Sequence, residues 1–184
     1  NVGEETAEWA KLTVTPEDNE TYSGVFERYK NFFVGTASGV FKSTNGGKAW
    51  LKMSSGIDAD SVTTLEEIGE NQIFAGTESG IYMSNDGGMS WMEVSGVFQT
   101  DFINQIDANT NASIYAATES GLYRSQDSGQ SWTDMEVTLT TEEALFVRHD
   151  ANGNVYASFE ASGLFSSTND GDDWNKVILG LNAG

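Results

Sequence analysis

Residues 84–91 read SNDGGMSW, and related octapeptides occur at 43–50 (STNGGKAW), 125–132 (SQDSGQSW) and 167–174 (STNDGDDW). Each octapeptide ends in a tryptophan. The five tryptophans of the chain lie at positions 9, 50, 91, 132 and 174, so successive ones are 41, 41, 41 and 42 residues apart. A fixed period of this length is the sequence signature of a repeat architecture. The spacing therefore predicts a chain built from one structural unit used several times.

Each repeat contains four short runs with the composition of β-strands. In the second copy these runs are 62–68, 72–76, 80–84 and 90–94, and Gly, Asn, Asp and Ser separate them. Such closely spaced runs predict an antiparallel meander, and no stretch keeps the period near 3.6 residues that marks a helix. A four-stranded sheet repeated about every 41 residues is the blade of a β-propeller. The predicted fold class is therefore all-β, with about four propeller blades and one extra strand.

The octapeptide also resembles a known motif. Its pattern S-x-D-x-G-x-x-W is similar to the Asp-box, or bacterial neuraminidase repeat, of β-propellers in sialidases, sortilin-type receptors, xyloglucanases and photosystem II assembly factors. The likeness extends over residues 9–180, and it implies that each box forms the hairpin between the third and fourth strands of a blade. The matching positions are Ser43, Asn45, Gly47 and Trp50; Ser84, Asp86, Gly88 and Trp91; Ser125, Asp127, Gly129 and Trp132; and Ser167, Asn169, Gly171 and Trp174.

The chemistry of the box favours a structural role over a catalytic one. A Ser hydroxyl and an Asp carboxylate two residues apart accept hydrogen bonds from the backbone of a tight turn. Glycine supplies a positive φ, and tryptophan buries a large ring between sheets. Asn45 and Asn169 replace the aspartate in two boxes, and an amide keeps the acceptor oxygen but is a poor base. We therefore predict that all four boxes hold turns.

The box positions also divide the chain, which we interpret as a single propeller or propeller segment over 1–184. Blades are expected at about 22–54, 62–95, 102–138 and 144–180, preceded by an orphan outer strand at about 8–15 around Trp9. Because the last blade already has its own outer strand, the orphan is surplus and favours an excerpt of a larger ring. A self-closed four-bladed ring with a displaced first strand is the alternative. The excerpt hypothesis predicts incomplete packing at Phe33, Val40, Phe165 and Ile178.

Composition limits the classes of partner. The 184 residues carry 28 acidic and 9 basic side chains, a formal net charge of −19, so nucleic acid and anionic membrane surfaces are unfavourable partners. No apolar run approaches the ~20 residues that would insert into a bilayer, and the absence of cysteine excludes disulfides and thiolate chemistry. The charge favours basic partners.

Two turn-like segments contain the acid spacing of a calcium loop. They are Asp107, Asn109 and Asn111 in DANTN, and Asp150, Asn152 and Asn154 in DANGN. Neither segment is followed by the glutamate that completes an EF-hand. Asp, Asn and Gly are also ordinary turn residues. We therefore predict two turns at equivalent places in the repeat, with no metal and no cofactor.

A catalytic centre is not apparent in the sequence. A sialidase needs a converging arginine cluster, whereas this chain has only Arg28, Arg124 and Arg148, of which Arg124 is expected on a third strand beside a box. The single histidine, His149, is predicted to lie in a turn or at a strand edge, without a catalytic neighbour. A glycosidase-type carboxylate pair is not marked out among the acids.

The face opposite the boxes carries the most suggestive pattern, a rim of acids. The candidate rim residues are Asp58, Asp60, Glu78, Glu119, Glu142 and Glu160, with Asp101 and Glu143 nearby and with Tyr22, Phe98 and Phe102 as aromatic neighbours that could stack on sugars. Such a rim fits a basic protein surface, and a merely solvated acidic surface is the alternative. The sequence thus favours a non-catalytic extracytoplasmic scaffold or recognition propeller that binds a protein partner. The alternative is part of a glycan-binding or glycan-cleaving propeller.

Overall fold

The computed structural model describes residues 26–28, 31–57, 61–68, 71–94, 98, 101–108, 113–135 and 142–178. These residues form four antiparallel four-stranded sheets and no helix. Sheet 1 consists of β1 (Phe26–Arg28), β2 (Asn31–Thr36), β3 (Gly39–Ser43) and β4 (Leu51–Lys52); sheet 2 of β5 (Val62–Ile68), β6 (Gln72–Thr77), β7 (Gly80–Ser84) and β8 (Met92–Glu93). Sheet 3 consists of β9 (Ile103–Ala108), β10 (Ile114–Thr118), β11 (Gly121–Ser125) and β12 (Thr133–Asp134); sheet 4 of β13 (Ala144–His149), β14 (Val155–Phe159), β15 (Gly163–Ser167) and β16 (Asn175–Lys176). The all-β prediction is confirmed.

Strand order within every sheet follows chain order, as a meander requires. The first three runs expected in the second repeat coincide with β5, β6 and β7, apart from one additional residue, Thr77, in β6. The fourth strand is much shorter than predicted, because β8 pairs with β7 only at Met92 and Glu93. Before it, the Trp91 N–H donates to the Ser55 carbonyl, 2.8 Å away in the connection that follows sheet 1. A hydrogen bond between blades therefore replaces the pairing of β8 with β7 at Trp91.

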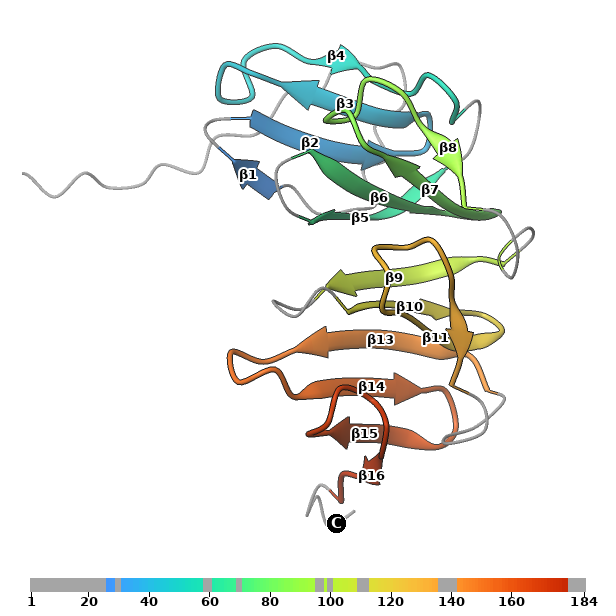
Figure 1. The fold of residues 1–184 in the computed structure, drawn as a ribbon. Helices are drawn as coiled ribbons and strands as arrows, with labels where there is room; N and C mark the ends of the chain where they lie inside the picture. The colour runs from blue at the N-terminus through green and yellow to red at the C-terminus, as the bar shows by residue number, and fades with distance from the viewer. Residues whose placement is uncertain are drawn as a thin grey trace, which may run out of the picture.

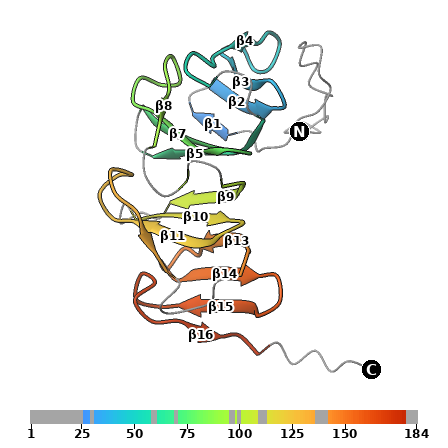
Figure 2. The same cartoon turned by 90° about the vertical axis from the view of Figure 1, so that its right-hand side faces the viewer.

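The four sheets lie one above another, with sheets 1 and 4 at opposite ends of the stack (Figures 1 and 2). The first strands of successive sheets lie together, β5 against β9 and β9 against β13. The hairpins that lead to β8, β12 and β16 project on one side of the stack, on the left of Figure 2. The expected orphan strand at 8–15 falls outside the described residues, so ring size and closure remain predictions.

Apolar side chains fill the three spaces between sheets. Phe33 and Val40 of sheet 1 pack against Ile73 and Ala75 of sheet 2, and comparable clusters join sheets 2 and 3 and sheets 3 and 4. The prediction that Phe33 and Val40 lack packing was wrong, because both face sheet 2 and are 5% and 0% exposed. Ile178, beyond the last strand, is 90% exposed.

A glycine–aromatic contact repeats at each junction between blades. The box glycines Gly88 and Gly129 have φ of +84° and +83°, and a Cβ there would lie 2.9 Å from Phe33 Cε1 and 2.5 Å from Phe74 Cζ. A Cβ on Gly171 would lie 2.8 Å from the hydroxyl of Tyr115. Each glycine thus lets a box turn sit directly on an aromatic ring of the preceding blade.

The carbonyl just before each of these glycines is also used between blades. The carbonyl of Gly87 accepts from Lys42 Nζ at 3.4 Å, and that of Ser128 accepts from Gln72 Nε2 at 3.3 Å. At the last junction, the carbonyl of Asp170 accepts from the Tyr115 hydroxyl at 2.6 Å. Ser128 and Asp170 keep positive φ values of 60° and 57° there, an uncommon conformation for residues with a side chain. Docking between blades therefore fixes the backbone of the box.

Candidate functional site

All four boxes have the same hydrogen-bond geometry. In the second box the Ser84 hydroxyl accepts from the Gly88 N–H at 2.9 Å and donates to Asp86 Oδ1 at 2.8 Å. Asp86 Oδ1 also accepts from the Ser90 N–H at 2.9 Å. The boxes that begin at Ser43, Ser125 and Ser167 repeat these three bonds. These side chains bind their own backbone, as expected of turn-forming residues.

The asparagine boxes show which atom of the aspartate matters. Asn45 Oδ1 accepts from the Ala49 N–H at 2.9 Å, and Asn169 Oδ1 accepts from the Asp173 N–H at 3.0 Å. An amide oxygen therefore occupies the place of a carboxylate oxygen. Unlike asparagine, Asp86 carries a negative charge. The Ser90 hydroxyl and N–H and the Ser84 hydroxyl donate hydrogen bonds to its carboxylate, and these bonds lower the pKa of Asp86 to about 2.

We expect Asp86→Asn to leave the Tm at neutral pH almost unchanged, because Asn45 and Asn169 already fill the same position. The wild-type carboxylate contributes stability that is present above its ordinary pKa of 3.8 and is lost as the pH falls towards about 2. The Tm of the variant should consequently fall less steeply than that of wild type between these values. Thermal melts across this range are the measurement, and a large loss of Tm at neutral pH would contradict the structural role.

On the opposite ends of the strands, three rim acids lie free on the surface. Glu78, Glu119 and Glu160 are exposed in the turns that join the second and third strands of sheets 2, 3 and 4. Their carboxylates form no hydrogen bond or ion pair with any described part of the chain. Asp58 and Asp60, also predicted for the rim, lie outside the described residues.

Glu142 differs from the other rim candidates because its carboxylate is fully engaged. It accepts from the Ser162 hydroxyl and N–H, both at 2.8 Å, and from the Ala161 N–H at 3.1 Å. Asp101 makes one hydrogen bond of the same kind, accepting from the Ser120 hydroxyl at 2.7 Å. Each of these two acids lies just before the first strand of a sheet and binds the turn between the second and third strands of the same sheet. Among the described residues, the free rim therefore consists of Glu78, Glu119 and Glu160.

The aromatic neighbours of the rim are also divided by the structure. Phe98 is completely buried and makes edge contacts with Tyr123 and Trp132, at centroid distances of 4.9 and 5.1 Å. It belongs to the core between sheets 2 and 3, so the sequence-based suggestion that it stacks on sugars was wrong. Phe102 is 37% exposed, and Tyr22 lies outside the described residues.

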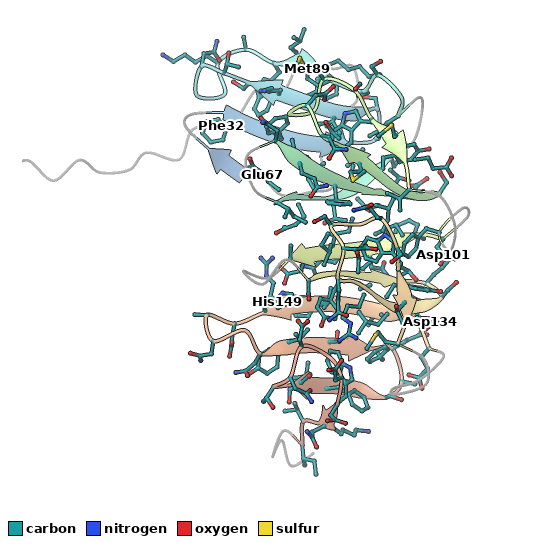
Figure 3. All side chains as sticks on the ribbon, viewed as in Figure 1. Phe32, Glu67, Met89, Asp101, Asp134 and His149 are labelled. Atoms are coloured by element: carbon teal, nitrogen blue, oxygen red, sulfur yellow. The ribbon has the colours of Figure 1, made fainter. Side chains whose placement is uncertain are left out.

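A second cluster lies at the other ends of the first strands and was not expected. Asp107 of β9 is buried and accepts from Arg148 Nη1 at 2.9 Å and from the His149 N–H at 2.8 Å. It also meets His149 Nδ1, while Figure 3 shows His149 at the end of β13, far from Asp101. The prediction that Asp107 is a turn residue was wrong, because it is a strand residue that joins two blades.

Glu66 extends this cluster towards sheet 2. Burial raises its pKa from 4.5 to about 7, and the negative charge of Asp107 adds to the effect, while Arg148 and a hydrogen bond from the Ala108 backbone oppose it. Glu66, Asp107 and Arg148 are 41 residues apart in succession, so they occupy equivalent places in three repeats. That period is the signal by which the cluster could have been found in the sequence.

We expect Glu66 to make stability depend on pH. Its raised pKa means that the folded state holds a proton that the unfolded chain has lost between about pH 4.5 and pH 7, so this group makes stability fall as pH rises through that window. Glu66→Gln should remove this loss, and its Tm relative to wild type should rise with pH up to about 7 and then level off. Exposed Glu93→Gln is the control, and parallel profiles for Glu66→Gln and wild type would contradict the prediction.

A cavity of about 330 Å³ lies beside the cluster, between the ends of β9 and β13 and the turn at 150–153. Arg148 borders it with a side chain that is 57% exposed, whereas the side chain of His149 is only 7% exposed. His149 Nε2 is buried and has no hydrogen-bond partner among the residues that the structure describes. A partly exposed guanidinium therefore borders the cavity, whereas Nε2 of the imidazole is closed off from solvent.

The predicted turn at Asp150 is observed, but it is not equivalent to Asp107. Asp150 Oδ1 accepts from the N–H groups of Asn152 and Asn154, at 2.8 and 2.9 Å, and Oδ2 accepts from Asn154 Nδ2 at 2.7 Å. These donors occupy both carboxylate oxygens, and they lower the pKa of Asp150. Within the described residues, no three His, Asp or Glu side chains come together in a metal-binding group.

We accordingly expect chelation to leave the Tm unchanged. EDTA removes any calcium, but the oxygens of Asp150 already have protein donors and those of Asp107 are held by Arg148 and His149. Thermal melts with EDTA and with added calcium measure this. A calcium-dependent rise in Tm that Asp150→Ala abolishes would overturn the prediction.

Taken together, the four sheets and the repeated box geometry define a β-propeller of Asp-box repeats. The family model of Sortilin-Vps10, described as sortilin, neurotensin receptor 3, matches residues 79–182, which is more than half of the chain. The chain belongs to this family.

Solved structures show the same fold at low sequence identity. The extracellular domain of BT4673 from B. thetaiotaomicron has a TM-score of 0.76 and 14% identity, covering 95% of this chain and 24% of that one. An ancestral GH74 enzyme has a TM-score of 0.73 and 24% identity, with coverage of 94% and 25%. YCF48 bound to a D1 peptide has a TM-score of 0.63 and 18% identity, with coverage of 86% and 56%.

This chain therefore spans between about a quarter and just over half of the length of these structures. No curated protein sequence matches it significantly. Within the described residues there is also no helix long and apolar enough to cross a bilayer.

Proposed function

We propose that this chain is a non-catalytic recognition propeller that binds a basic protein surface through the free rim and acts outside the cytoplasm. The observation that carries the proposal is the repetition of an exposed, unpaired glutamate in the same turn of three successive blades. The Glu142 carboxylate and one oxygen of Asp101, by contrast, are engaged in contacts within their own blades. A row of free carboxylates on a chain of net charge −19 attracts cationic partners and speeds their encounter.

Three comparisons support this proposal, although none of them identifies a partner. YCF48 has this fold and was solved bound to a peptide, and the neighbour from B. thetaiotaomicron is an extracellular domain. Membership of the sortilin family also favours a receptor-like role outside the cytoplasm. Partner binding and location are both extended to this chain as part of the proposal.

The rim is tested with a fluorescein-labelled lysine–glycine repeat peptide. We expect the triple variant Glu78→Gln/Glu119→Gln/Glu160→Gln to weaken binding and to reduce its dependence on salt. The matched control Glu93→Gln/Asp134→Asn/Asp173→Asn removes the same charge from exposed positions at or near the fourth strands. Equal weakening by both variants would mean that net charge alone attracts the peptide, and would overturn the rim as a binding site.

A glycan-cleaving propeller is the second candidate, favoured by the likeness to a GH74 enzyme and by the pKa of Glu66. A protonated carboxyl near neutral pH suits a general acid, and glycosidases pair such a group with a second free carboxylate. Asp107 is the nearby acid, but three donors from Arg148 and His149 already bind it. Release of reducing sugar from polysaccharides that Glu66→Gln abolishes would favour this alternative over recognition.

A further inference from the structure

Two asparagine–glycine pairs occur in the chain, at 45–46 in the first box and at 152–153 in the DANGN turn. Such a pair can rearrange without an enzyme, because the backbone nitrogen of the glycine attacks the side-chain amide carbon of the asparagine. Glycine favours this reaction, since it has no Cβ to hinder the approach and its backbone rotates freely. The sequence does not distinguish the two pairs, whereas the structure does.

The second pair is protected by its own turn. The Gly153 N–H, which supplies the attacking nitrogen, donates to the Asp150 carbonyl at 3.1 Å. Asp150 Oδ1 binds the N–H groups of the residues on either side, Asn152 and Asn154, at 2.8 and 2.9 Å. These hydrogen bonds hold the backbone in place, so attack on Asn152 must first break the bond at Gly153.

The first pair is open to solvent and free to rotate. Asn45 and Gly46 are both exposed. Gly46 has a φ of +72°, and a Cβ built on it would meet no atom within 4 Å. None of the described residues accepts a hydrogen bond from the Gly46 N–H. The described surroundings of Gly46 therefore leave room for the rotation that brings its nitrogen to the Asn45 amide.

The first box holds the Asn45 amide by its oxygen alone. Oδ1 accepts from the Ala49 N–H at 2.9 Å and from the Ser43 hydroxyl at 3.0 Å. Attack at Cγ places a negative charge on this oxygen, and donors already directed at it stabilise that charge. Nδ2, the leaving group, has no hydrogen-bond partner among the described residues. In the fourth box, by contrast, Nδ2 of Asn169 donates to Asp173 at 2.8 Å.

We propose that Asn45 is a site of spontaneous deamidation, which converts the first box from its asparagine to its aspartate form. The Gly46 nitrogen bonds to Asn45 Cγ as the bond from Cγ to Nδ2 breaks. The proton of the Gly46 N–H passes through water to Nδ2, which leaves as ammonia, and a five-membered succinimide remains. Water then opens this ring at the side-chain carbonyl to give aspartate, or at the backbone carbonyl to give isoaspartate.

The two products affect the box differently. Aspartate keeps the acceptor oxygen and is the residue type that the second and third boxes already contain, at Asp86 and Asp127. Isoaspartate inserts a methylene group into the backbone between Ser43 and Gly47, whose 2.9 Å hydrogen bond depends on that spacing. The aspartate product should therefore keep the Tm of wild type, and the isoaspartate product should lower it. This site goes beyond the proposed function and does not depend on the free rim.

Peptide mapping by mass spectrometry follows deamidation while the folded protein is incubated in warm, mildly alkaline buffer. We expect Asn45 to convert roughly tenfold faster than Asn152, the usual effect of a hydrogen bond that must break first. In urea the two pairs should convert at similar rates, because the turn no longer protects Asn152. Asp150→Ala removes the acceptor of two turn bonds and should speed conversion at Asn152 in the folded protein without changing the rate at Asn45.

Asn45→Asp is the control for the product. It should show no mass gain in the peptide that contains residue 45, and its Tm should equal that of wild type. The proposal fails if Asn45 stays intact in the folded protein under conditions that convert it in urea. It also fails if Asn152 reacts as fast as Asn45 in the folded protein.

Discussion

Trp91→Ala is expected to lower the free energy of unfolding by about 3–5 kcal/mol, the usual cost of emptying a buried aromatic site. The ring is 4% exposed and packs with Phe33, Val40 and Ile57 between sheets 1 and 2. Its Nε1 donates to the Met53 carbonyl at 2.7 Å, so the alanine variant also leaves a carbonyl without its donor. Denaturant titration, followed by circular dichroism, measures the loss.

Two further variants, Met92→Ala and Trp132→Ala, provide comparisons for the stability loss of Trp91→Ala. Met92→Ala removes a side chain that is 59% exposed directly beside Trp91, and should change stability little. Trp132→Ala should fall in the same range as Trp91→Ala, because its ring makes edge contacts with Phe74 and Phe98. A loss below about 1 kcal/mol for Trp91→Ala would show that the box tryptophan does not hold the blades together.

Gly129→Ala is expected to cost roughly 2–4 kcal/mol, from a strained positive φ together with overpacking. The φ of Gly129 is +83°, and an added Cβ would lie 2.5 and 2.6 Å from two atoms of the Phe74 ring. That ring is fully buried, so it cannot move aside without disturbing the core between sheets 2 and 3.

A glycine of the first box that lacks the packing contact provides the control for this prediction. Gly46 has a φ of +72°, but an added Cβ would meet nothing within 4 Å, so Gly46→Ala should show only the backbone cost of about 1–2 kcal/mol. Combining Gly129→Ala with Phe74→Leu should cost less than the sum of the two changes, because the smaller side chain relieves the contact. Equal losses for Gly46→Ala and Gly129→Ala would contradict docking of the box on the preceding blade.

Much of the fold was predictable because the box is a local structure. The Ser84, Asp86 and Gly88 bonds span at most four residues, so the octapeptide specifies its turn wherever it occurs. The 41-residue period then fixes how many such turns follow one another. Hydrogen bonds of this range depend on residue type and spacing, which a sequence displays directly.

The period could have placed Glu66, Asp107 and Arg148 at equivalent positions, but the contacts of this cluster were not predictable in the same way. Asp107 and His149 are 42 residues apart, and Asp107 reads as part of a turn-forming DANTN segment. Only the stacking of β9 against β13 brings the carboxylate to the imidazole and to Arg148. The pKa of Glu66 likewise depends on burial between blades, which no local pattern contains.

The acidic rim was likewise predictable in part from the sequence and decided in part by the tertiary structure. The sequence placed Glu78, Glu119, Glu142 and Glu160 on one face, since the period puts equivalent residues at equivalent ends of the blades. Tertiary structure decided which of them are free, because Glu142 reaches the Ser162 turn while the other three have no partner within the described residues. Repetition thus determined the fold and its turns, whereas the contacts that form when blades stack determined which side chains remain available for function.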